Sequence, residues 1–463
     1  MNGIVKYKGI VNIIITSTII LIQSSVFFIT WVIFYNNHLL YSPFYNRGFI
    51  LLVLVYIILL ITFSSIYGGY KIGYFRVSDV IYSQIISLIF VNAITYMQTS
   101  LMDRRLLNPI WLIAMTIVQI FFAILWAYIT NKIYFKVFPP MKVIVVYGNS
   151  SVENFIKKLN LRNDKYNVSS VVNINEGIDN IMSQIACYDA AVIYDVESSI
   201  RNKILKYCFQ LSINTYITPK VSDIILGSSD KIHLFDTPLL LCKNKGISYE
   251  QKIIKRIIDI FISIFAIILL LPFMLLVAVL IKMCDGGPIL FKQKRLTIND
   301  KVFNVFKFRS MVINAESDGV ARLASKNDNR ITKVGKIIRK IRFDELPQLF
   351  NVLMGDMSIV GPRPERPEIA EQYIEIMSEF KFRTKVKAGI TGYAQIMGKY
   401  NTTPYDKLKL DMMYIEGFSL FMDLKIMLMT IKYLFTPKNL DSTEGIDDGE
   451  SLPCYVAYTK DKE

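Results

Sequence analysis

Two adjacent acids, Asp344 and Glu345, are the residues of this chain best suited to chemistry on a charged substrate. Lys336 and Arg339 precede them at helical spacing, so a basic cluster is expected one or two turns away. Neighbouring carboxylates do not share a helix face, which favours two distinct roles: one nucleophile, and one metal ligand or positioning group. The cations should lower the carboxylate pKa and attract an anionic substrate. The alternative is a helix boundary where an acid caps the N-terminus before Pro347.

A second basic pair occurs in the segment FNVFKFRSM, residues 303–311, which has the alternation of a strand. Lys307 and Arg309 are two positions apart, so both should point to one face of that strand. Two cations on a rigid strand form a phosphate clamp, in which arginine binds bidentately. The alternative is an ordinary solvated strand face.

Two loops complete the set of candidate elements. In GDMSIVGPRPERPE, residues 355–368, Pro362 and Pro364 fix the backbone on both sides of Arg363. A rigidly held arginine loses little entropy when it binds phosphate. Glycines and aromatics in the segment that begins at Lys387 predict a binding loop, and its last part, 418–435, predicts an amphipathic helix on a membrane surface.

Composition limits what these residues can be part of. The 463 residues are 52% hydrophobic and only 20% charged, which argues against a disordered protein or an ordinary soluble enzyme. The net charge is +15, of which residues 246–436 carry +10, so anionic partners are expected. The five cysteines form no CxxC pair, which argues against a disulfide framework or a zinc site. The only histidines are His38 and His233, so chemistry in the last 230 residues must proceed without histidine.

Residues 1–140 contain four long apolar runs, and each predicts a membrane-spanning helix. The runs are 11–35, 49–66, 80–97 and 109–130. The third run is the weakest, because it is diluted by Ser83, Gln84, Ser87, Asn92 and Thr95. Seven basic residues flank the runs on the side of the N-terminus and three on the other side. This asymmetry predicts that the N-terminus and everything after residue 131 are cytoplasmic.

A fifth apolar run, 257–283, has strongly positive flanks at both ends. Pro272 lies near its midpoint and should break the helix. A kinked helix that enters one leaflet and leaves on the same side satisfies both observations. The alternative is a fifth spanning helix.

Residues 141–245 alternate short apolar strands with amphipathic stretches, which predicts a parallel sheet of Rossmann type. The expected strands are 143–147, 168–173, 190–194 and 213–217. The first turn contains a single glycine, Gly148, where a dinucleotide fingerprint requires three. A structural or regulatory domain is therefore favoured over nucleotide binding. Residues 437–463 form an acidic tail that is expected to be disordered.

Residues 252–436 closely resemble the catalytic domain of the bacterial sugar transferases, the polyprenyl-phosphate phosphoglycosyl transferases. The resemblance rests on KRIIDI, the proline-broken apolar hairpin, VFNVFKFRSM, RFDELPQLFNVLMGDMSIVGPRPE and AGITGYAQ. The large form of that family shares the whole architecture. The expected fold is thus an α/β membrane protein with a four-helix transmembrane bundle (1–140), a Rossmann-like domain (141–245) and a monotopic α/β catalytic domain (246–436) with a re-entrant helix.

The resemblance implies transfer of a sugar 1-phosphate from a UDP-sugar to undecaprenyl phosphate, with release of UMP. Asp344 would be the nucleophile that forms an aspartyl-phosphosugar, Glu345 would assist, and Mg²⁺ would bind at or near the pair. Arg339, Arg363 and Asp411 match further family positions. Arg342 departs from the family, because that position is often filled by a small residue.

The implied setting is the bacterial plasma membrane, with catalysis on its cytoplasmic face at the first committed step of capsule or exopolysaccharide synthesis. The implied partners are the lipid bilayer, a second copy in a homodimer and downstream glycosyltransferases, and nucleic acid is not among them. Three alternatives remain: a membrane-bound NAD-dependent sugar-nucleotide dehydratase, a non-catalytic assembly scaffold, and a conventional glycosyltransferase that releases UDP.

Overall fold

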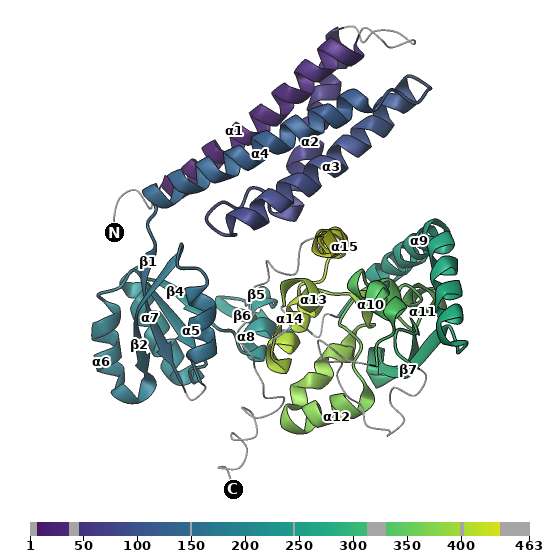
Figure 1. Cartoon of the computed structure of the whole chain (residues 1–463). Coiled ribbons are helices and arrows are strands. Elements are labelled where there is room, and N and C mark those ends of the chain that lie inside the picture. The colour runs from purple at the N-terminus through teal and green to yellow at the C-terminus, as the bar shows by residue number, and fades with distance from the viewer. Residues whose placement is uncertain are drawn as a thin grey trace. The chain divides into compact units, whose positions relative to one another are not determined.

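The computed structural model describes residues 7–36, 46–148, 151–243, 246–312, 330–398 and 402–435. They belong to two compact units, Met1–Thr218 and Pro219–Glu463 (Figure 1). The predicted acidic tail lies outside the described residues.

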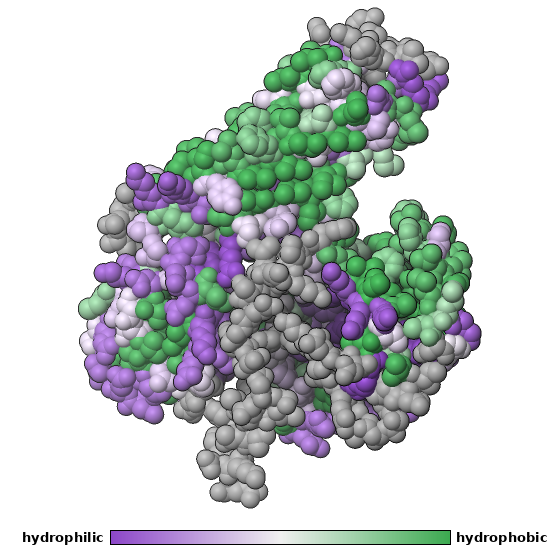
Figure 2. All heavy atoms as spheres, in the orientation of Figure 1, coloured by the Kyte–Doolittle hydropathy of each residue, from purple (hydrophilic) through white to green (hydrophobic). Residues whose placement is uncertain are grey.

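Four long helices begin the first unit, and they cover the four predicted apolar runs. They are α1 (Lys8–Thr30, continued by the π-helix η2, Trp31–Tyr35), α2 (Asn46–Tyr67), α3 (Val77–Met102) and α4 (Ile110–Val137). Each is long and apolar enough to cross a membrane. Figure 2 shows that apolar residues dominate the visible surface of these helices, as expected for segments that face lipid.

The polar residues of α3 lie inside the first unit instead of facing outward. Asn92 donates from Nδ2 to Gln119 Oε1 at 2.8 Å, and Gln119 donates from Nε2 to the hydroxyl of Tyr56 at 2.8 Å. Gln23 donates from Nε2 to the Gln119 carbonyl at 3.0 Å, so one chain of hydrogen bonds joins α1, α2, α3 and α4. Side chains of this kind link helices where no water is available. The weak hydropathy of the third apolar run therefore reflects buried interhelical contacts.

The predicted parallel sheet follows α4. Its strands are β1 (Met141–Tyr147), β2 (Tyr166–Asn173), β3 (Ala190–Tyr194) and β4 (Asn214–Ile217), in the order β2-β1-β3-β4 and all parallel. Helices α5 (Glu153–Asn160), α6 (Ile178–Ile185) and α7 (Ser198–Gln210) connect them, with the short η3 (Ile174–Glu176) after β2. The four strand predictions are confirmed.

The glycine of the first turn has a packing role. A Cβ at Gly148 would lie 2.2 Å from the backbone oxygen of Asp195, which follows β3. Only glycine lets these two turns approach so closely. The glycine therefore needs no bound phosphate to explain it.

The second unit holds the remaining elements. They are α8 (Val221–Gly227), β5 (Asp230–Leu234), β6 (Thr237–Leu241), α9 (Tyr249–Asp285), β7 (Leu290–Leu296), η4 (Ile298–Asp300), β8 (Val302–Phe308), α10 (Lys333–Lys340), η5 (Phe343–Glu345), α11 (Gln348–Met354), β9 (Ser358–Val360), α12 (Pro367–Ile376), η6 (Ser378–Lys385), β10 (Gly389–Thr391), α13 (Tyr393–Met397), α14 (Pro404–Glu416) and α15 (Leu420–Phe435). The hairpins β5–β6 and β7–β8 are antiparallel, and β9 pairs in parallel with β10. Residues of α8 share the hydrophobic core of this unit with β8, α11, β9 and α14.

Helix α9 contains Pro272 and turns sharply in Figure 1. Near its start, Arg256 donates to the carbonyl of Val352 in α11. Near its end, Ile281 packs in one cluster with Phe308 of β8. A straight helix would separate Arg256 and Ile281 by ~37 Å, yet their partners lie in adjacent elements, because α11 is hydrogen bonded to β8. The proline therefore allows both halves of α9 to contact one body.

Between these contacts α9 is strongly exposed and apolar. Phe261, Phe265 and Ile268 are 72%, 62% and 69% exposed, and Figure 2 shows the visible surface of α9 as largely hydrophobic. An apolar surface of this extent in a folded chain requires a covering such as lipid. The entry and exit of α9 on the same side of a membrane stays a prediction.

Cysteine labelling tests this topology in a background without the native cysteines. With Gln251→Cys and Leu290→Cys, which flank the apolar part of α9, an impermeant maleimide should label both sites in inverted vesicles and neither in intact cells. The control Leu106→Cys, between α3 and α4 and 84% exposed, should show the opposite pattern. Labelling of positions 251 and 290 from opposite sides would establish a spanning helix.

Candidate active site

Asp344 and Glu345 lie in η5, a single turn between α10 and α11. Arg342, just before this turn, has a left-handed backbone with φ 57°, a conformation that costs a non-glycine residue of order 1–3 kcal/mol. Such strain is found where the surrounding structure fixes a functional turn. Helix α11 begins after Pro347 without a side-chain cap, so the alternative that one of the acids is a capping residue has no support.

Glu345 binds two cations from distant parts of the chain. Lys307 Nζ, on β8, lies 3.0 Å from Glu345 Oε1. Arg363 Nη2, in the loop after β9, lies 2.9 Å from the same oxygen. Within the described residues both cations donate to Oε1, which leaves Oε2 for another ligand.

The two acids have opposite electrostatic environments. Burial alone would raise the pKa of Glu345, but the charges of Arg363 and Lys307 outweigh burial and hold its pKa well below the usual range. Burial, followed by the negative charge of Glu345, raises the pKa of Asp344, despite the opposing effect of Lys307 and Arg339. The two acids therefore have different surroundings, and their distinct chemical roles stay a prediction. The expectation that the cations lower the carboxylate pKa is correct for Glu345 and wrong for Asp344, because desolvation dominates there.

Arg339 approaches the pair from α10. Its Nη1 atom is buried and has no hydrogen-bond partner among the described residues, and its charge acts on Asp344. A buried guanidinium nitrogen without a partner is costly, and a phosphate oxygen at this position would satisfy it. Among described side chains, none forms a hydrogen bond with the carboxylate of Asp344.

The ion pairs of Glu345 among the described residues do not involve the other predicted site residues. Lys336 is exposed on α10, and Arg309 follows β8 with 7% of its surface exposed. Asp411 is buried in α14, where it pairs with Arg383 at 2.7 Å. The structure thus brings together Asp344, Glu345, Lys307, Arg339 and Arg363.

Asn351 is a positioning residue that the sequence analysis did not identify. This buried side chain of α11 accepts a hydrogen bond from the Phe306 amide at 2.9 Å and donates to the Asn304 carbonyl at 2.8 Å. It therefore fixes α11 against β8, and with it the distance between Glu345 and Lys307. In the sequence, the only indication of this role is that Asn351 stands among the apolar residues of QLFNVLM.

Three glycines set the position of the loop that carries Arg363. A Cβ at Gly389 would lie 2.1 Å from the Gly361 nitrogen, and a Cβ at Gly392 would lie 2.2 Å from the Gly361 oxygen. The glycines of AGITGYAQ therefore allow two backbones to touch. This segment, predicted as a binding loop, supports the arginine loop through these contacts.

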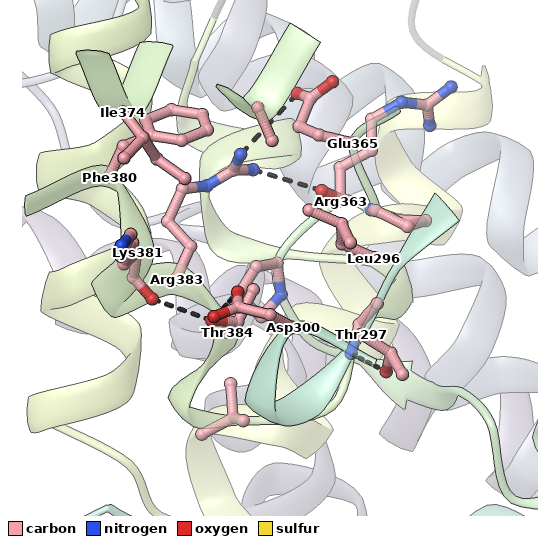
Figure 3. Close-up of a pocket in the computed structure, with 15 residues that line it drawn as sticks. Leu296, Thr297, Asp300, Arg363, Glu365, Ile374, Phe380, Lys381, Arg383 and Thr384 are labelled. Atoms are coloured by element: carbon pink, nitrogen blue, oxygen red, sulfur yellow. Dashed lines mark hydrogen bonds and ion pairs between the residues drawn. The ribbon is translucent and has the colours of Figure 1, made fainter. Parts of the chain in front are cut away.

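Arg363 is one of the residues that line a small pocket (Figure 3). Its walls include Leu296, Asp300, Glu365, Arg383 and Thr384. Its volume of about 30 Å³ accommodates one or two water molecules, far less than a site for a nucleotide requires. Asp344 and Glu345 are not among the residues that line this pocket.

The donor set suits Mg²⁺. Asp344 and Glu345 offer hard carboxylate oxygens, and among the described residues no group of three or more metal-ligating side chains occurs. Mg²⁺ is commonly bound through one or two carboxylates, with the remaining positions filled by water and substrate phosphates. The pair therefore fits a magnesium ion that binds together with a phosphorylated substrate.

Comparison with known proteins gives one family and several relatives. Residues 250–437 match the family model described as bacterial sugar transferase. A relative from Aeromonas hydrophila, UDP-N-acetylgalactosamine-undecaprenyl-phosphate N-acetylgalactosaminephosphotransferase, is 39% identical over 50% of this chain and 55% of its own length. UDP-glucose:undecaprenyl-phosphate glucose-1-phosphate transferase of Klebsiella pneumoniae is 42% identical over 43% of this chain and 42% of its own length. These matches thus span about half of each relative.

A shorter relative is matched almost throughout. Exopolysaccharide production protein PSS of Rhizobium leguminosarum bv. phaseoli is 42% identical over 39% of this chain and 94% of its own length. The part of the chain that the family model matches, residues 250–437, contains both acids.

The opposite pKa shifts predict opposite effects on stability. A raised pKa means that ionisation of Asp344 costs the folded state stability at pH values above the unfolded pKa. Asp344→Asn should therefore raise the midpoint of thermal unfolding at pH 7 in EDTA, and this gain should disappear as the pH falls through the raised pKa. Glu345→Gln should lower the midpoint, because the stability from a depressed pKa is present above the unfolded value and lost only at lower pH.

Circular dichroism or differential scanning fluorimetry of the detergent-solubilised variants measures both midpoints. A lower midpoint for Asp344→Asn at pH 7 would contradict the assigned environment of Asp344.

Proposed function

Because the chain belongs to the bacterial sugar transferase family, we propose that it transfers a sugar 1-phosphate from a UDP-sugar to undecaprenyl phosphate and releases UMP. The names of the Aeromonas and Klebsiella relatives support this substrate pair. The observation that carries the proposal is the unequal pair of acids. Glu345 is fixed by two cations, while Asp344 has no hydrogen bond from a described side chain. The charge of Arg339 acts on Asp344, and the buried Nη1 of Arg339 has no hydrogen-bond partner among the described residues.

In the first step a carboxylate oxygen of Asp344 attacks the phosphorus next to the sugar. The bond from this phosphorus to the bridging oxygen breaks, UMP leaves with that oxygen, and the phosphosugar stays on Asp344 as an acyl phosphate. Arg339, Lys307 and Arg363 offset the negative charge of the diphosphate. Glu345 holds Lys307 and Arg363 in place for this task.

In the second step a phosphate oxygen of undecaprenyl phosphate attacks the same phosphorus. The bond to Asp344 breaks, which restores the carboxylate and gives undecaprenyl-diphospho-sugar. Bound Mg²⁺, held by Asp344 and Glu345, would neutralise phosphate charge. Neither step moves a proton to or from the attacking oxygen, so neither requires a histidine.

The exposed apolar surface of α9 and the long apolar N-terminal helices support a membrane setting for this reaction. With the catalytic domain on the cytoplasmic face, UDP-sugar arrives from the cytosol and the lipid phosphate from the bilayer. The product would begin an exopolysaccharide or capsule repeat unit, which downstream glycosyltransferases would extend.

The nucleotide released from a panel of UDP-sugars tests the reaction class. Purified protein with undecaprenyl phosphate and Mg²⁺ should release UMP from one or a few sugars, measured by chromatography. Release of UDP would establish glycosyl transfer and would contradict attack on phosphorus.

Asp344→Asn should lower turnover by roughly 10⁴-fold or more, as expected when a nucleophile is removed. Glu345→Gln should cost about 10²–10³-fold, because it removes an electrostatic and positioning group. Lys301→Met, a change of an exposed lysine paired with Asp356, serves as a control that should retain full turnover. Near-normal turnover of Asp344→Asn would exclude Asp344 as the nucleophile.

Removal of divalent metal ions tests the proposed role of Mg²⁺ separately. EDTA should abolish UMP release, and excess Mg²⁺ should restore it, because two carboxylates and three cations alone leave the diphosphate charge incompletely matched. Full turnover in EDTA would contradict a metal role at the pair.

A further inference from the structure

We propose that Arg383 is a positioning residue that acts through Arg363, and that Asp411 is its anchor. This inference rests on the proposed function. Arg383 lies in η6 with 6% of its surface exposed. Its Nε donates to Asp411 Oδ2 at 2.7 Å, its Nη2 donates to the carbonyl of Arg363 at 3.1 Å, and its Nη1 lies 3.7 Å from Glu365 Oε1.

The guanidinium of Arg383 is held firmly. Asp411 is 1% exposed and comes from a different element, α14. Charged hydrogen bonds at buried sites are strong, and loss of one partner leaves an uncompensated charge. The ring of Phe380 also packs against this guanidinium, at 4.7 Å from its centroid. Arg383 is therefore a fixed point from which another segment can be placed.

That segment is the loop that carries Arg363. Figure 3 shows the Arg383 guanidinium between Glu365 and the backbone of Arg363. Arg295 donates from Nη1 to the carbonyl of Pro364, the residue after Arg363, at 3.1 Å. The main chain of Arg363 is thus held by Arg383, while its side chain reaches Glu345.

Arg383 acts by placing Arg363, and its own positive charge is less important for the reaction. Arg383 contacts Arg363, and Arg363 in turn contacts Glu345. Arg383 can therefore influence the site without touching the substrate itself. Misplacement of a catalytic group by about 1 Å costs on the order of 10²-fold in rate. A planar guanidinium can bind the three groups together, whereas the single ammonium of lysine cannot reproduce this geometry. Arg383→Lys therefore keeps the charge and removes the hold on Arg363.

The experiment is a double-mutant cycle in the full-length protein, with UMP release as the readout. Arg383→Lys should lower kcat by about 10–100-fold with a smaller effect on KM for the UDP-sugar. In an Arg363→Lys background the same change should cost less than about 2-fold, because the group that Arg383 positions is already absent. The matched control Thr384→Ala alters the same pocket and should leave the kcat of each background unchanged.

Two outcomes would overturn the inference: an unchanged kcat in Arg383→Lys, or an equal loss in both backgrounds, which is the signature of a general structural effect. If Arg383→Lys does not fold, Asp411→Asn weakens the anchor and goes through the same cycle with the same criteria. Failure of the proposed function is distinguishable, because wild-type protein would then release no UMP.

Discussion

The contact of Glu345 with Lys307 and Arg363 is the constraint on which the rest of the catalytic unit depends. Three segments far apart in the sequence meet at one carboxylate oxygen. Asn351 ties the strand of Lys307 to the helix after the acids, and close glycine contacts place the loop of Arg363. The two halves of α9 pack on α11 and on the cluster of β8 and α10. The apolar surface and the charged site are therefore built on the same few elements.

This arrangement keeps Asp344 in an unfavourable environment. Burial and the neighbouring charge of Glu345 both raise its pKa, and no described side chain compensates through a hydrogen bond. The proposed role of Asp344 as nucleophile requires that its oxygens remain available to the substrate, so full satisfaction of these oxygens within the protein would oppose that role. The strained backbone of Arg342 belongs to the same turn.

The parts of the fold that depend on local pattern were predictable from the sequence. Apolar runs of sufficient length gave the long helices, and alternating short strands gave the parallel sheet. Lys307, Arg339 and Arg363 were also identified, because basic residues beside turns and strands are visible in the chain. Arg383 and Asn351 were not, since a buried polar contact depends on which distant segments meet. The pKa of Asp344 was predicted in the wrong direction because desolvation is a property of the folded state.

The central claim is that Asp344 carries the phosphosugar between two substrates. Its most direct test is the mass of the protein after rapid mixing with a UDP-sugar that supports turnover, with Mg²⁺ and without undecaprenyl phosphate, followed by peptide mapping. We expect an added phosphosugar on the peptide that contains Asp344, and loss of this mass when undecaprenyl phosphate is added. An unmodified protein that still turns over when both substrates are present would contradict it and would indicate direct transfer between the substrates.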